Sequence, residues 1–481
     1  MSRRKQNQTN KKKTLHIFDI ALISIQFVLS IFLAYLAKKV LPMKYWLIVV
    51  AIFLVLWLLV FFVLRNKKNS AKQMWLRLVS LVLSILIGVG SVFAYKGVSV
   101  LNNITGGKYQ TQVISVVVLK DSSYQKIKDL ENKSLGYVSA IDTDNINKAI
   151  DNIGTKDKTT LTKTNYSDLS QLQKALVNKE CDAIIFNEAY RGIIEEFNGD
   201  FSNQTRVIYQ YEIKETLNKN TSTVNVTKDA FNVYISGIDT YGPVSTVSRS
   251  DVNMIMTVNP KTKQILLTSI PRDYHVTLAS FNARDKLTHS GIYGIEETMS
   301  TVENLLNIDL NYYMRVNFTS LITMVDAVGG INVNVDQAVT VGGHTLSVGS
   351  NYMDGETALA FSRERYSYAD GDRHRVRNQQ AVLTGLLNKL MSASMITNYN
   401  SILNSVSGAF ETNMESGDLQ KLIQMQIDDM SSWDIEQISL DGSGSTSTNC
   451  YSMPGYELYV MDPDQSTVTA AKQKIDAVEG R

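Results

Sequence analysis

The residues of this chain best suited to chemistry are arginines. Several of them fall within the run SRERYSYADGDRHRVRNQQ, and Arg272 stands in the short segment SIPRD. A guanidinium group is permanently charged and grips phosphate oxygens through paired hydrogen bonds. Such a cluster beside aspartates indicates a polyanion site, most simply for a pyrophosphate; a solvated, salt-bridged surface is the alternative. The clustered residues are Arg363, Arg365, Arg373, Arg375 and Arg377.

The segment after the cluster has helical spacing. One stripe, at intervals of three and four residues, changes from cation and amide to aliphatic, through Arg375, Gln379, Val382, Leu386 and Leu390. If the leucines face the core, Arg375 and Gln379 point into the interior or a cleft. A buried charge needs an anionic partner. That partner is either a ligand or, as a structural pair, Glu364 or Asp372.

Aspartates and Arg272 are placed at the ends of predicted strands. The alternating run FNVYISGIDT delivers Asp239 to its carboxyl end, and Asp251 follows Arg249 in the turn before NMIMTV. The turn NPKTK joins NMIMTV to ILLTSI as a hairpin, which ends at Arg272 and Asp273. Magnesium prefers oxygen ligands, often one or two carboxylates with phosphate oxygens.

The remaining pattern of residues 229–481 alternates strands with helices. Helical spacing occurs in EETMSTVENLLNI, TSLITMVDAV, DGETALAFSRER and DLQKLIQMQIDDM, while YYMRVNF and INVNVDQAVTV read as strands. This order predicts an α/β or α+β sandwich with a mixed central sheet.

A smaller α/β domain is predicted at residues 108–213. VISVVVLK and CDAIIF read as buried strands, and the segments IDTDNINKAIDNI and SDLSQLQKALV between them read as helices, so the sheet should be partly parallel. We find no catalytic constellation here and expect an accessory role. Residues 214–228 are polar and read as a linker.

Three apolar segments precede both domains, at residues 17–37, 45–64 and 75–95. Each has about twenty residues, enough to cross a hydrocarbon layer of about 30 Å. Lysine and arginine are richest in the N-terminal tail and in the loop after the second segment, which places both in the cytoplasm. Residues 1–96 are therefore a cytoplasmic basic tail with three transmembrane helices, and the rest lies outside. The basic tail suits lipid headgroups; we expect no nucleic-acid partner.

Other residue types exclude some classes of site. The five histidines show no HxH or HExxH spacing, which argues against zinc. Cys181 and Cys450 are far apart in sequence. We expect two separate buried thiols, with a disulfide as the alternative.

The ordered series GID, RSD, SIPRD, KLTHSGIYG, VDAVGGI, DGETALAFSRER and GDRHRVRNQQ resembles the LytR–CpsA–Psr family of exported phosphotransferases, closely over residues 229–391. Three spans and an extra outer domain resemble its streptococcal capsule-locus members. The resemblance implies a Gram-positive cell-membrane protein that moves a capsular polysaccharide or similar glycopolymer from undecaprenyl diphosphate to peptidoglycan. Membrane lipids and other capsule-locus proteins are further expected partners.

The resemblance also assigns residues. It implies magnesium, or manganese in its place, on Asp239 and Asp251. Pyrophosphate would be bound by Arg272, Arg363, Arg365 and Arg375, with the amide of Gln379 beside them. Here the sequence departs from the usual R-Q-Q: it reads Arg-Asn-Gln-Gln, and Gln380 is the alternative amide.

The expected catalytic residues are Asp251, Arg272 and Arg375. Phosphoryl transfer needs mainly positioning and charge neutralisation, and arginines with a metal supply both. The acceptor hydroxyl must lose a proton, to Asp251 or Asp273. Two other functions fit the same residues: a transmembrane regulator of capsule biosynthesis that binds polyprenyl phosphate lipids, and a magnesium-dependent pyrophosphatase.

Overall fold

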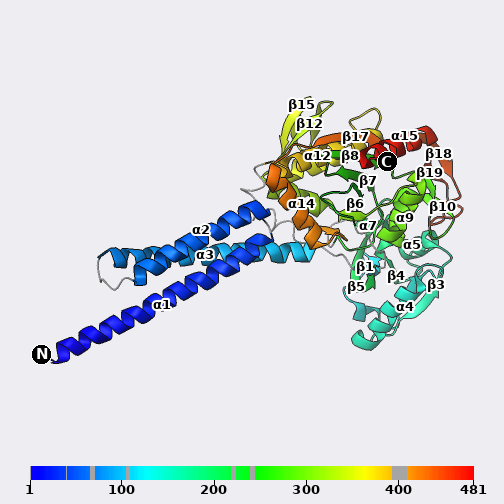
Figure 1. Ribbon diagram of the computed structural model, residues 1–481. Coiled ribbons are helices and arrows are strands. Elements are labelled where there is room, and N and C mark those ends of the chain that lie inside the picture. The colour runs from blue at the N-terminus through cyan, green and yellow to red at the C-terminus, as the bar shows by residue number, and fades with distance from the viewer. Residues whose placement is uncertain are drawn as a thin grey trace.

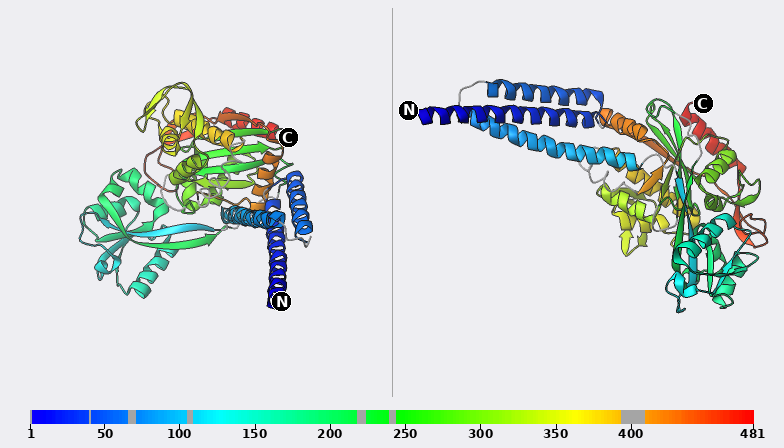
Figure 2. Two further views of the ribbon diagram at one scale, coloured as in Figure 1. Left: turned by 90° about the vertical axis from the view of Figure 1, so that its left-hand side faces the viewer. Right: turned by 90° about the horizontal axis from the view of Figure 1, so that it is seen from below.

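The structure is a computed structural model that describes residues 2–39, 41–65, 71–104, 109–217, 224–238, 244–392 and 409–481. Its N-terminal part is three long helices, α1 (Ser2–Lys38), α2 (Met43–Arg65) and α3 (Ala71–Ile104). They contain apolar stretches long enough to cross a membrane, at Ile17–Lys38, Met43–Phe62 and Met74–Lys96. These agree with the predicted spans to within a few residues. The helices project together from one side of the folded part (Figures 1 and 2).

Polar side chains join α1 to α3. Arg77 Nε lies 2.7 Å from Asp19 Oδ1, and both side chains are largely buried. Closer to the folded part, Ser80 donates a hydrogen bond of 2.5 Å to Gln26 Oε1. Polar groups in apolar spans seek such partners, so these contacts fix how the two helices face each other.

The loop between α1 and α2 touches the folded part. Lys44 Nζ lies 2.9 Å from Asp428 Oδ1, and Gln424 donates to the Lys38 carbonyl oxygen at 3.2 Å. Both partners belong to α14 (Ser416–Asp429). The α1–α2 loop therefore lies on the same side of the three spans as the two sheets.

The first unit is a five-stranded sheet in the order β3-β2-β4-β1-β5. Strand β2 is parallel to β3 and β4, whereas β1 is antiparallel to β4 and β5, so the sheet is partly parallel as predicted. Helices α4 (Thr143–Asn152), α5 (Leu169–Val177), α6 (Arg191–Phe197) and α7 (Phe201–Gln204) accompany it. The strands are β1 (Tyr109–Leu119), β2 (Ser134–Tyr137), β3 (Thr162–Asn165), β4 (Ala183–Asn187) and β5 (Thr205–Thr216).

The second unit contains a mixed sheet, as predicted. It has six strands in the order β16-β11-β6-β7-β8-β17. Strands β6, β7 and β8 are antiparallel neighbours, while β11 runs parallel to β6 and β17 parallel to β8. The predicted hairpin is β7–β8. The strands are β6 (Phe231–Gly237), β7 (Val252–Asn259), β8 (Gln264–Ile270), β11 (Tyr312–Val316), β16 (Phe410–Thr412) and β17 (Asp434–Ser439).

Helices cover both faces of this sheet. On one face, α9 (Ile295–Leu306) and α15 (Gln465–Glu479) bury apolar side chains against Tyr234, Ile255 and Leu266. On the other face, α12 (Asp372–Leu390) and α14 pack against the opposite side chains of β6, β7 and β8. The alternation of side chains along each strand thus fills two separate cores.

A small lobe extends from α12. It contains α10 (Phe318–Ala327), α11 (Gly355–Arg363), and the pairs β12 (Ile331–Val335) with β15 (Gly349–Met353) and β13 (Val339–Val341) with β14 (His344–Leu346). INVNVDQAVTV, predicted as one strand, is two strands, because β12 and β13 pair with different partners. Gly329 and Gly330 close α10 with positive φ, as glycine allows.

Short elements near the site complete the fold. The strand pairs β9 (His275–Thr277) with β10 (Arg284–Lys286), and β18 (Gly442–Ser447) with β19 (Leu458–Pro463), flank the one-turn helix α8 (Leu287–Ser290).

The two units share a hydrophobic core. Met453 and Val460, from the C-terminal segment, pack in one cluster with Leu172 and Ile193 of the first unit. Cys181 and Cys450 are in the same cluster, buried and unpaired, as predicted. The segment around residues 450–460 therefore ties the units together. The domain limits 108–213, 214–228 and 229–481 stay predictions.

Candidate active site

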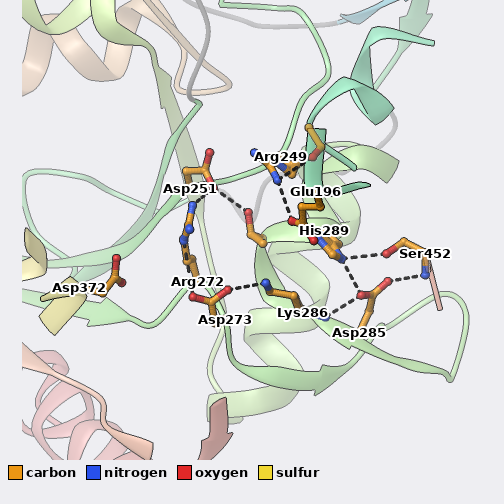
Figure 3. Close-up of polar contacts among 12 residues, drawn as sticks. Glu196, Arg249, Asp251, Arg272, Asp273, Asp285, Lys286, His289, Asp372 and Ser452 are labelled. Atoms are coloured by element: carbon orange, nitrogen blue, oxygen red, sulfur yellow. Dashed lines mark hydrogen bonds and ion pairs between the residues drawn. The ribbon is translucent and has the colours of Figure 1, made fainter. Parts of the chain in front are cut away.

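Asp251 and Arg272 meet at one edge of the mixed sheet. Asp251 immediately precedes β7, and Arg272 is the second residue after β8; because these strands pair in antiparallel register, their ends coincide. Arg272 Nη1 donates to Asp251 Oδ1 at 2.8 Å, and Thr288 Oγ1 donates to the same oxygen at 3.0 Å (Figure 3). The hairpin predicted from the sequence is what brings carboxylate and guanidinium together.

The other oxygen of Asp251 has no such partner. Oδ2 is buried and accepts no hydrogen bond from the described residues. Burial raises the pKa of Asp251, but the charges of Arg249 and Arg272 and the hydrogen bonds from Thr288 and Arg272 outweigh burial and lower that pKa overall. The carboxylate is therefore ionised at neutral pH, with one oxygen available to a cation or polar ligand.

Arg272 is surrounded by acidic groups. Its Nε lies 3.6 Å from Asp273 Oδ2, and Asp273 Oδ1 in turn lies 2.8 Å from Lys286 Nζ. Burial alone would lower the pKa of Arg272, yet the carboxylates of Asp251, Asp273 and Asp372 raise it. The Nε–H of Arg272 is buried, and none of the described residues accepts a hydrogen bond from it.

Arg375 points inward from the first turn of α12, as the stripe predicts. Val382 and Leu386 on the same stripe are buried, while Arg375 and Gln379 are half-buried. Of the two carboxylates considered as structural partners, Asp372 contacts Arg375 Nη2. Burial lowers the pKa of Arg375, and the charges of Arg272 and Arg365 act in the same direction. Its Nε–H also lacks a hydrogen-bond acceptor among the described residues.

The other clustered arginines divide into two groups. Arg363, at the end of α11, is exposed, and its guanidinium lies 4.1 Å from the centre of the Phe318 ring. Arg365 donates to the Tyr366 hydroxyl at 2.7 Å and is close enough to Arg375 to influence its pKa. Arg373 and Arg377 turn away from Arg272, toward surface aspartates.

Those surface pairs match the salt-bridge alternative. Arg373 Nη2 lies 2.6 Å from Asp441 Oδ1, and Arg377 Nη2 lies 2.7 Å from Asp370 Oδ2. The run of arginines is therefore part site and part surface. The assignments of Arg363, Arg365 and Gln379 to a ligand stay predictions.

The two candidate amides have different surroundings. Gln380 is buried and donates to the Ile438 carbonyl oxygen at 2.6 Å, which ties α12 to β17. Gln379 has one long hydrogen bond, 3.4 Å to the Ser362 carbonyl oxygen. Gln379 is thus the amide with donor and acceptor capacity to spare.

A second polar cluster lies beside the first and was not foreseen. Arg249 Nη1 donates to Glu196 Oε1 of α6 at 3.0 Å, and His289 Nε2 lies 3.5 Å from the same oxygen. His289 Nδ1 lies 2.8 Å from Asp285 Oδ1, and the ring is fully buried (Figure 3). The tripeptide Thr288-His289-Ser290 stands in KLTHSGIYG, so the motif was visible in the sequence, but its partner Glu196 was not.

The charged groups of this cluster stabilise one another. Burial raises the pKa of Glu196, but the hydrogen bond and charge of His289 outweigh burial and lower that pKa to about 2. Burial lowers the pKa of His289, but Asp285 and Glu196 raise it overall. The cluster links the first unit to the segment that carries Asp251.

The fit of a metal ion depends on Asp251. Among the described residues, no three His, Cys, Asp or Glu side chains gather as ligands. Asp239 lies outside the described residues. The buried, unpartnered Asp251 Oδ2 fits one carboxylate ligand of a magnesium ion whose other ligands are phosphate oxygens and water.

Comparison with known proteins agrees with the motif series. The profile of the LytR_cpsA_psr family matches residues 199–474, more than half of the chain. A second profile, for a DNA polymerase processivity factor, matches residues 67–186. That match covers about a quarter of the chain and omits β5 of the first sheet, so it shows no family membership.

Curated relatives cover somewhat less than half of the chain. A protein of Enterococcus faecalis named polyisoprenyl-teichoic acid–peptidoglycan teichoic acid transferase TagU is 38% identical over 215 residues, 44% of this chain and 70% of that protein. A protein of the same name from Bacillus anthracis is 32% identical over 224 residues, 46% and 73%. The crystal structure of B. subtilis TagV has 28% identity and a TM-score of 0.45, over 53% of this chain and 98% of that one. On the profile match and the identities to the two TagU proteins, the chain belongs to the LytR_cpsA_psr family.

Proposed function

We propose that this protein is a membrane-anchored phosphotransferase that moves a glycopolymer from a polyprenyl diphosphate carrier to peptidoglycan. One structural observation carries the proposal. Among the described residues, no hydrogen-bond acceptor meets the buried Nε–H of Arg272 or of Arg375, and no donor meets the buried Asp251 Oδ2. Unpaired buried polar groups are unfavourable, and a diphosphate with its cation would satisfy all three. The names of the TagU relatives support the same substrate class.

The proposed reaction is a displacement at phosphorus. The acceptor hydroxyl oxygen attacks the phosphorus that carries the glycan, and the bond from that phosphorus to the bridging oxygen breaks. Its electron pair leaves with polyprenyl phosphate, which finally carries the hydroxyl proton. The products are a glycopolymer–peptidoglycan phosphodiester and polyprenyl phosphate.

The residues of the site contribute charge and position. Arg272 and Arg375 bind the diphosphate and neutralise the charge that gathers on the leaving phosphate. Arg363, at the end of α11, and Arg365, two residues later, extend the cationic surface, and Gln379 orients an oxygen through its amide. Asp273 is occupied by Lys286 and Arg272. Asp251 is therefore the better placed of the two carboxylates considered for the acceptor hydroxyl.

Asp251 and Asp239 would together hold magnesium or manganese. The ion would supply a positive charge that offsets the negative charge of the diphosphate. Asp251 also orients Arg272 through the 2.8 Å hydrogen bond, so a single carboxylate couples the cation to the guanidinium.

The membrane topology is part of the proposal. The tail and the loop after the second span are rich in lysine and arginine, which supports a cytoplasmic position for both. The sheets then lie outside the cell membrane of a Gram-positive bacterium. The contacts of Lys38 and Lys44 with α14 agree, because they put the α1–α2 loop beside the sheets. A cysteine at the exposed Ser350 should react with an impermeant maleimide on intact cells, and one in the basic tail only after lysis.

The transferase proposal is tested by reconstitution. The full chain in lipid nanodiscs receives a glycopolymer-loaded polyprenyl diphosphate, magnesium and purified peptidoglycan. We expect glycopolymer covalently bound to the wall, with polyprenyl phosphate released in equal amount. Free glycopolymer phosphate with an unmodified wall would identify a pyrophosphatase instead. Binding of the lipid without turnover would leave the regulator. The capsular nature of the polymer is tested by loading the carrier with capsular polysaccharide and with teichoic acid.

A further inference from the structure

A polar cleft leads from the first unit to Asp251. Its volume is about 890 Å³. One wall is a face of the β1–β5 ribbon, the second is α6 with the turn before it, and the third is residues 245–249, with Asp251 at its end. Arg272 and Arg375 do not line it. Asp251 is therefore the point where the cleft meets the diphosphate site.

The wall formed by β5 is an open face of the sheet. Gln210, Glu212 and Lys214 alternate along this edge strand with their side chains exposed in the cleft, whereas Tyr211 and Ile213 pack against the core on the other face. Successive side chains of a strand point to opposite faces of the sheet. Gln210, Glu212 and Lys214 therefore lie on the face opposite the core. The face is built to remain in contact with solvent or a polar ligand.

The lining carries both signs of charge. Glu195 and Glu212 stand near Arg206 and Arg249, with hydroxyl and amide side chains between them. The apolar side chains of the lining, Tyr109, Val113, Val207 and Val247, stand among charged groups that a polyprenyl chain would desolvate, and a polyanion would meet acidic groups. A glycan strand with a peptide offers hydroxyls, amides, carboxylates and amines. These groups complement the hydroxyl, amide and charged side chains of the cleft.

The first unit contacts the segment that precedes β7 and carries Asp251. The Arg249 guanidinium lies across Gly192 of α6, donating to the Gly192 carbonyl oxygen at 3.3 Å and to Glu196 at 3.0 Å. A Cβ at position 192 would lie 2.4 Å from Arg249 Cζ, so this approach requires glycine. The cleft and the position of Arg249, two residues before Asp251, are therefore built by both units jointly. Figure 3 shows Arg249 beside Glu196 of the first unit.

From these observations we infer that the cleft binds the acceptor, a peptidoglycan glycan strand with its stem peptide. The inference rests on the proposed function and deepens it. In a displacement at phosphorus the attacking and leaving oxygens lie roughly in line. The acceptor must then approach from a different side than the arginine-bound leaving phosphate, and the cleft opens on such a side of Asp251. Its β1 and α6 walls precede residue 199, where the family match begins. The first unit thus supplies an acceptor site to the transferase.

The test places a bulky side chain in the cleft. Gln210→Trp fills it from an exposed position of β5, and Thr164→Trp, at the opposite edge of the same sheet, is the matched control. Glu212→Ala, which adds no bulk, is a second variant should the tryptophan disturb folding, and melting temperatures report on that. The full chain in nanodiscs is titrated with a disaccharide–tetrapeptide released from peptidoglycan. Turnover is measured with donor and acceptor varied separately.

We expect Gln210→Trp to raise the acceptor KM and the disaccharide–tetrapeptide Kd by about tenfold or more, with the donor KM unchanged. Glu212→Ala should raise both by about threefold, and Thr164→Trp should change neither. Variants that bind the fragment like wild type would overturn the inference, as would a rise confined to the donor KM, which would assign the cleft to the donor glycan. If wild type shows no transfer but binds the fragment in a Gln210-dependent way, the proposed reaction fails and the acceptor site stands.

Discussion

Asp251 is proposed to bind a metal ion and to orient Arg272. Replacing it with asparagine separates these two roles. The variant keeps the size of the side chain, and its amide oxygen still accepts the hydrogen bonds that Thr288 and Arg272 make with Oδ1. What disappears is one buried negative charge and the metal ligand at Oδ2. Asp273, at 3.6 Å from Arg272 Nε, remains to hold the guanidinium. We therefore expect Asp251→Asn to fold normally.

The charge has opposite effects on turnover and on metal-free binding. Without the cation ligand, turnover should fall about a hundredfold or more, the usual loss when one transition-state contact is removed. Without magnesium, however, the charge of Asp251 repels a diphosphate bound by Arg272. Two unit charges about 6–10 Å apart at an effective dielectric of about 20 interact by roughly 1.5–3 kcal/mol. Metal-free binding should then tighten about ten- to a hundredfold.

Calorimetric titration with a water-soluble, short-chain prenyl diphosphate in a chelator measures that binding. The charge-matched control is Asp441→Asn, since Asp441 pairs with Arg373 at the surface. The reasoning is refuted if Asp251→Asn keeps wild-type turnover at saturating substrate. Weaker metal-free binding in a variant with a normal melting temperature would refute the electrostatic part and show that the negative charge is needed to hold Arg272 in place.

Three further predictions follow from other contacts. Arg375→Lys should lose about a hundredfold in turnover, because lysine lacks the planar fork, while Arg373→Lys should keep its activity in the same assay. Gln380→Leu should destabilise the fold by about 1–3 kcal/mol in denaturant titrations, because the buried Ile438 carbonyl loses its donor, whereas Gln379→Leu should lower turnover and leave stability unchanged. Glu196, with its pKa lowered to about 2, stabilises the fold fully above about pH 4.5 and less as pH falls. His289, with a raised pKa, does so fully below about pH 6.5 and less as pH rises through its folded pKa. The melting temperature should therefore be highest between these values, and His289→Asn should flatten its alkaline decline.

The parts of the site that the sequence predicts are those that local rules determine. A short turn between two apolar runs makes β7 and β8 neighbours, and this is sufficient to bring Asp251 to Arg272. Helical period alone points Arg375 toward the side buried by Val382 and Leu386. Both inferences need only spacing along the chain.

Contacts between distant segments were beyond those rules. Nothing in the spacing of Glu196 shows that it meets His289, nor that Cys450 and Met453 pack against the first sheet. Spacing shows which side of an element is buried, but not against what it packs. For the same reason the run of arginines could not be divided in advance: Arg373 and Arg377 turn to Asp441 and Asp370, which come from other segments. The split of INVNVDQAVTV likewise depends on two separate partner strands.

The Glu196–His289–Asp285 cluster, in which His289 and Asp285 are fully buried, explains why the first unit belongs in any account of the site. A buried ion pair is weak evidence for added stability, but breaking it is strongly destabilising, because removing one member leaves an uncompensated charge. Here Glu196 comes from α6, Asp285 from β10 and His289 from α8, and Arg249 extends the cluster to within two residues of Asp251. Movement of the first unit relative to the mixed sheet would break these contacts and shift Arg249, whose charge helps keep Asp251 ionised. A ligand held between the units would therefore bear directly on the carboxylate that orients Arg272.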